Sequence, residues 1–73
     1  MEEYIFEVVS TPEYTERFFF DRGFTGARAP IVENHMVTFP YNTPDEKETV
    51  ERAKVLLELN GVPHRAVGFH CWS

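Results

Sequence analysis

The chain has 73 residues, which is the size of one small domain and leaves no room for a second. Hydrophobic residues make up 42% of it, and seven Phe, three Tyr and one Trp supply large areas for a core. Twelve acidic against seven basic residues give a net charge of −5, which argues against a domain that binds the backbone of duplex DNA or RNA.

The first predicted element is a strand over residues 4–9, which is rich in aromatic and β-branched residues. Successive side chains of a strand point to opposite faces, and Glu7 marks one of these faces as exposed to water. Tyr4, Phe6 and Val8 are therefore expected to point toward the core. The exposed face would carry Ile5, Glu7 and Val9.

A helix is predicted to begin at Thr11 and Pro12. The Thr11 hydroxyl can accept a hydrogen bond from a free amide of the first turn, and Pro12 suits the first helical position. Glu13 follows where the helix dipole favours negative charge. Gly23 predicts the end of this helix, because glycine readily adopts the left-handed conformation that closes a helix.

Two strands are predicted next, over residues 27–33 and 35–41. Pro30 cannot donate a hydrogen bond to a neighbouring strand, which places the first of them at a sheet edge or a bulge. Glu33 and Asn34 are expected to form the tight turn between the two strands.

A second helix is predicted from Thr43 and Pro44, and Thr43 with Glu46 has the spacing of a capping box. It is expected to end at Asn60 and Gly61, and a last strand to follow over residues 64–72. The segment 41–45 repeats the pattern of 9–13 thirty-two positions later, so both halves of the chain open a helix in the same way.

The predicted order is β-α-β-β-α-β, made of two β-α-β halves that each need a right-handed crossover. Two such halves that share one sheet give a ferredoxin-like α+β sandwich. This fold has a four-stranded antiparallel sheet with two helices on one face.

The first helix carries more aromatic residues than one face can bury. At 100° per residue, Tyr14, Phe18 and Phe19 fall within an arc of about 140° and form the predicted core stripe. Phe20 falls roughly opposite. Either the chain after Gly23, with Phe24, folds back over Phe20, or Phe20 belongs to an exposed surface for a partner.

The second helix shows a similar excess. Val55 and Leu59 lie outside its predicted inward stripe and widen the apolar arc to about 220°. These two side chains either pack against the first helix or the C-terminal tail, or they serve self-association or a protein partner. The inward stripe itself consists of Val50, Ala53, Leu56 and Leu57.

The residues that could bind a metal lack diagnostic spacing. His70 and Cys71 are adjacent in a predicted strand and point to opposite faces, and His64 lies about 20 Å from His70 along it. Together with His35 they predict no metal site, and no motif predicts a cofactor. Cys71 is expected to be a small buried or half-buried side chain, not a nucleophile.

Arg28 lies in a glycine-containing loop that follows a helix instead of opening one, so the loop is not a phosphate-binding motif. If the protein is a small enzyme or ligand-binding domain, its pocket is expected at a dimer interface and its ligand contacts to be Arg28, His35 and His70.

The favoured function is a non-catalytic protein-interaction module that docks on a protein partner or forms a homodimer. Its contacts would be Phe20, Val55 and Leu59, or alternatively the sheet face with Ile5, Glu7 and Val9. It could be a small regulator or inhibitor, including a virus-encoded one that competes for a basic, nucleic-acid-binding surface.

No apolar run is long enough to span a membrane, and residues 1–10 lack the pattern of a signal peptide. The single cysteine excludes an internal disulfide framework. We therefore expect a soluble protein of a reducing compartment, the cytoplasm, with no membrane contact.

Overall fold

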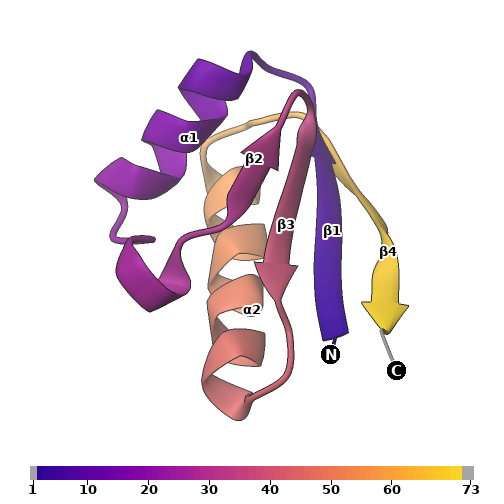
Figure 1. Cartoon of the computed structure of the whole chain (residues 1–73). Coiled ribbons are helices and arrows are strands. Elements are labelled where there is room, and N and C mark those ends of the chain that lie inside the picture. Colours follow the sequence, from indigo (N-terminus) through magenta and orange to yellow (C-terminus); the bar gives the residue numbers. More distant parts are fainter. Residues whose placement is uncertain (1, 72–73) are drawn as a thin grey trace.

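The computed structural model describes residues 2–71, the last three of them by their backbone alone. Four antiparallel strands form one sheet in the order β2-β3-β1-β4 (Figure 1). Both helices pack on the same face, which confirms the predicted ferredoxin-like α+β arrangement. The elements in chain order are β1 (Glu2–Val8), α1 (Pro12–Asp21), the short 3-10 helix η1 (Gly26–Arg28), β2 (Ile31–Glu33), β3 (Met36–Pro40), α2 (Pro44–Leu59) and β4 (His64–Cys71).

The strand predicted over residues 27–33 is much shorter than expected. Its first half folds instead as η1, because Gly26 has a φ of 61° and Pro30 cannot join a ladder. The remaining strand β2 lies at the sheet edge, as Pro30 predicts. The turn to β3 consists of Asn34 and His35, one residue later than expected, with Asn34 at a φ of 54°.

Both helices begin where the sequence predicts. The Thr11 hydroxyl accepts a hydrogen bond of 3.1 Å from the Tyr14 amide. At α2, Thr43 accepts from the Glu46 amide at 3.2 Å, and the Glu46 carboxylate accepts from the Thr43 amide at 3.0 Å. This completes the predicted capping box.

The two helices also end in the same way. After α1, the Gly23 amide donates to the Phe20 carbonyl and the Phe24 amide donates to the Phe19 carbonyl. This pair of bonds is a Schellman motif, with Gly23 at a φ of 89°. After α2, Gly61 has a φ of 64°, and the amides of residues 61 and 62 donate to the carbonyls of residues 58 and 57. The internal repeat therefore extends to both helix ends.

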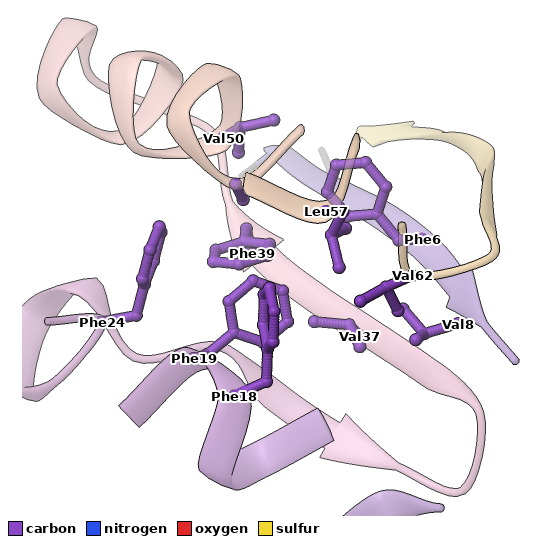
Figure 2. Packing of buried hydrophobic residues seen from close by; sticks show 11 residues of the cluster. Phe6, Val8, Phe18, Phe19, Phe24, Val37, Phe39, Val50, Leu57 and Val62 are labelled. Carbon is purple, nitrogen blue, oxygen red and sulfur yellow. The ribbon is translucent and has the colours of Figure 1, made fainter. Parts of the chain in front are cut away.

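The core lies between the helices and the sheet, and phenylalanine dominates it. The Phe19 ring packs edge-on against Phe18, Phe24 and Phe39 with centroid distances of 5.2, 5.3 and 5.5 Å (Figure 2). These contacts join α1, the following loop and β3. The other buried hydrophobic members of this cluster are Phe6, Val8, Val37, Val50, Ala53, Leu57 and Val62.

The strand alternation predicted for β1 is confirmed. Phe6 and Val8 are buried in the core, and Tyr4 packs against it. The opposite face of β1 carries Ile5 and Glu7, which are half-buried. Trp72, predicted as the end of the last strand, lies outside the described residues.

One prediction for α1 is wrong, and one of the two alternatives for Phe20 is excluded. Tyr14 is 51% exposed instead of buried, and Thr15 takes the core position, its hydroxyl donating to the Thr11 carbonyl at 3.0 Å. The loop after Gly23 does fold back, but it carries Phe24 into the core and does not cover Phe20. The Schellman motif explains this, because it brings the second residue after the cap against the last turn of the helix.

Replacing Thr43 with Ala should lower the free energy of unfolding by about 0.5–2 kcal/mol, since it removes the acceptor of the capping box. Denaturant unfolding measures the change. Thr25→Ala is the matched control, because Thr25 precedes η1 without a side-chain capping bond. Equal midpoints for the two variants would contradict the role of the cap.

The capping box should also make stability depend on acid. Hydrogen bonds from the Asn42 and Thr43 amides hold the pKa of Glu46 below its ordinary value of 4.5. This stabilisation is complete above the unfolded pKa and is lost as pH falls through the folded pKa. Glu46→Gln should therefore flatten the fall in melting temperature below pH 4.5. Glu48→Gln removes the same charge from α2 outside the box, and an equal flattening there would contradict the prediction.

Candidate docking surface

Phe20 stands in solvent on α1, with 67% of its surface exposed. It lines a hollow of about 460 Å³ between α1 and the segment that leads into β2. We call this hollow the α1–β2 groove. Its lining is mostly apolar and consists of Glu16, Phe19, Phe20, Phe24, Thr25, Gly26, Ala29, Pro30 and Val32.

The acidic side of the groove comes from α1. Glu16 lies one helical turn before Phe20 and lines the groove with it. Glu13, Glu16 and Arg17 line a second, more open hollow together with Phe20. The exposed aromatic ring therefore stands among charged residues, two acidic and one basic.

Val55 and Leu59 are also exposed, by 54% and 77%. They follow each other by one turn of α2, on the side away from the buried Val50, Ala53 and Leu57. Neither packs against the hydrophobic cluster, although their neighbour Leu56 does. The two side chains form a small apolar strip on the outer side of α2.

The structure does not bring Phe20 together with this strip. Phe20 faces the segment before β2, whereas the opposite flank of α1 faces α2. On that flank the Arg22 guanidinium stacks 3.8 Å from the Phe18 ring centre and donates to the Asn60 side chain at 3.2 Å. The predicted contacts Phe20, Val55 and Leu59 thus lie on two separate surfaces.

The open face of the sheet is the third surface, and it combines apolar and charged residues. Ile5 is half-buried there, and Val9, just after β1, is exposed. Glu7 accepts a hydrogen bond of 2.7 Å from Nε of Arg65 on β4. The strand registers add three further exposed residues to this face or its edge that were not predicted from the sequence: Ile31, Met36 and Val67.

The alternative ligand contacts do not converge. Arg28 lies in η1 and lines a small hollow of about 60 Å³ with Arg22 and Arg52. His35 lies in the turn between β2 and β3, where its Nδ1 donates to the Ser10 carbonyl at 3.0 Å. The side chain of His70 lies outside the described residues.

The small hollow beside Arg28 is electrostatically mixed. Asp45 and Glu48 at the start of α2 line it together with the three arginines. Its volume is well below the roughly 300–1,000 Å³ of pockets that hold organic ligands. This arrangement is typical of a charged helix-to-loop contact.

Lys54 of α2 has a raised pKa because of its contacts with β1 and with its own helix. Hydrogen bonding to the Tyr4 side chain and to Glu51 raises the pKa of Lys54 above its ordinary value of 10.5. Its Nζ lies 4.6 Å from the centre of the Tyr4 ring and 3.2 Å from the Glu51 carboxylate. Lys54 thereby ties α2 to β1 and contributes to no pocket described above.

Within residues 2–71, no helix combines the length and the apolar character needed to cross a membrane. The part of the chain that the structure describes holds no group of three or more His, Cys, Asp or Glu side chains able to bind a metal ion. The side chain of Cys71 lies outside that part. Comparison of the chain with protein-family models, with curated proteins and with solved structures found no match.

The domain should fold without a metal. A chelator is expected to leave its far-UV circular dichroism and its melting temperature unchanged, because the spacing of His35, His64, His70 and Cys71 supports no structural site. A metal-depleted buffer without chelator serves as the control. A large loss of structure caused by the chelator would contradict this prediction.

Proposed function

We propose that this chain is a non-catalytic protein-interaction module that acts by docking on a protein partner. The observation that carries the proposal is the exposure of Phe20, Val55 and Leu59 in a chain with a well-packed core. Phe20 stands in a mostly apolar groove and Val55 and Leu59 adjoin on α2, and contiguous exposed apolar surface marks interaction sites.

The chemistry of the described residues supports docking over catalysis. General acid–base catalysis needs a carboxylate or histidine in a pocket together with a group that it can serve. Arg28 and His35 lie on different elements, and each already has structural neighbours. The largest hollow described above, the α1–β2 groove, is lined mainly by apolar residues, which suits recognition of an apolar group.

The net charge favours a basic partner. A chain with a charge of −5 attracts a basic protein surface and speeds its encounter with that surface. This supports a role as a small regulator or inhibitor that covers a basic surface of a larger protein. The single cysteine is in keeping with action in the cytoplasm. Self-association through the same apolar side chains is the second form of the proposal.

Leu59→Glu or Val55→Glu should abolish association through the strip on α2 while the monomer stays folded, because both side chains are exposed. Light scattering measures self-association, and affinity capture from the host lysate measures partner binding. Lys47→Gln, at another exposed position of the same helix, changes the net charge by the same amount and is the matched control. Added salt should change the association rate more than the affinity. Charged side chains around an apolar contact steer the encounter of the two proteins, and salt screens them.

Two results would contradict this role of the strip. If both variants unfold the monomer, the side chains contribute to folding and the contact surface must lie elsewhere, with the sheet face around Ile5, Glu7 and Val9 as the next candidate. If both variants stay folded and associate as well as the unchanged protein, the strip takes no part in binding.

A further inference from the structure

The free edge of β2 presents backbone hydrogen-bonding groups beside the α1–β2 groove. A two-residue turn joins β2 to β3, so the closing pair of Glu33 and Met36 exchanges both of its hydrogen bonds. Hydrogen-bonded and non-hydrogen-bonded pairs alternate along an antiparallel ladder, and Val32 therefore forms a non-hydrogen-bonded pair with Val37. Its N–H and C=O consequently point away from β3, toward the open edge.

The side chain of Val32 points into the groove. Val32 lines it together with Phe20 and Phe24, and it also packs against the core. If a further strand paired with β2, the residue opposite Val32 would point its side chain to the same side of the sheet as Val32 does. One residue of such a strand would therefore bond to the Val32 backbone and place its side chain in the groove.

The groove has room for a large apolar side chain. Its volume of about 460 Å³ lies within the roughly 300–1,000 Å³ of pockets that hold organic ligands. The Phe20 and Phe24 rings come from α1 and the loop after it, and Pro30 comes from the segment before β2. A helix in this position would leave the backbone groups of Val32 unused, so the geometry favours an extended chain.

The exposed side chains of β2 determine which residues suit the positions before and after the inserted one. Ile31 and Glu33 are exposed and point to the open face of the sheet, on either side of Val32. The residues that flank the inserted side chain would lie beside them. An aliphatic residue suits Ile31, and Lys or Arg suits Glu33. Glu16 adds a second negative charge inside the groove.

From this arrangement we propose that the α1–β2 groove binds an extended segment of a protein partner, which adds to β2 as a further strand. The segment inserts a large apolar side chain next to Phe20, and a basic residue adjacent to it in sequence lies beside Glu33. This inference rests on the proposed function and specifies how the partner docks.

The test uses the full chain, immobilised and probed with a displayed library of short random peptides. Binding peptides should be enriched in an aromatic or large aliphatic residue with Lys or Arg directly next to it. Synthetic copies of these peptides are then titrated against variants. Phe20→Ala should weaken binding by about tenfold or more, as expected for an anchor contact. Tyr14→Ala truncates another exposed aromatic side chain of α1 that does not line the groove, and it should leave binding unchanged.

Two further variants test the strand addition itself. Val32→Pro removes the N–H that faces the peptide, and prolines are tolerated on edge strands where the N–H faces solvent. It should weaken binding while the melting transition is retained. Glu33→Lys should shift the library's preference from a basic to an acidic flanking residue, and this readout does not depend on the fold of the proline variant.

The proposal is overturned if no peptide class is enriched, or if the enriched peptides bind the Phe20→Ala variant as well as the unchanged protein. The same holds if Glu33→Lys leaves the charge preference unaltered. Peptides or partners that are lost with Leu59→Glu and retained with Phe20→Ala would preserve the proposed function while rejecting the groove. Absence of any protein or peptide binding and of self-association would reject both.

Discussion

Three consecutive phenylalanines on one short helix cannot share a face, and this constraint shapes both the core and the surface. Each residue turns the helix by about 100°, so burying Phe18 and Phe19 directs Phe20 outward. Phe19 takes the central position, in ring contact with Phe18, Phe24 and Phe39. The packing that stabilises α1 on the sheet is thus the reason that an aromatic ring stands in solvent.

The glycines after the helices determine which side chains complete the core. Gly23 closes α1 and brings Phe24 against Phe19, just as Gly61 closes α2 and brings Val62 into the same cluster as Leu57. The segment that follows α1 lines the groove on its way to β2. Because Phe24 is committed to the core, the loop does not shield Phe20, and the α1–β2 groove stays open.

The parts of the fold that local signals encode could be predicted from the sequence. Thr43, Pro44 and Glu46 specify a helix start by themselves, and Pro30 restricts a strand to the edge. The Thr-Pro helix start occurs in both halves of the chain, and together with the strand patterns it predicted the topology. The burial of Thr15 in place of Tyr14 could not be predicted in this way, because it depends on where the helix lies over the sheet.

The candidate surfaces were only partly predictable for the same reason. The excess of apolar residues on the helices indicated Phe20, Val55 and Leu59, but helical periodicity alone did not separate them into two surfaces. That separation follows from the packing of α1 between α2 and β2. The exposure of Ile31 and Met36 follows from the pairing of β3 with β2, which has three residues and is shorter than predicted.

The two edges of the sheet differ in how well they are suited to accept another strand. In the pairing of β1 with β4, Ile5 of β1 faces Gly68 and Phe6 faces Ala66. Val67 of β4 therefore has no opposite residue and forms a bulge. A bulge bends and twists a strand, and it discourages regular pairing along its edge. The edge of β2 is short, but it is free of such a bulge in its pairing with β3 and lies directly beside the apolar groove. Backbone groups and an apolar pocket therefore occur together at β2, where they can be used by the same incoming chain.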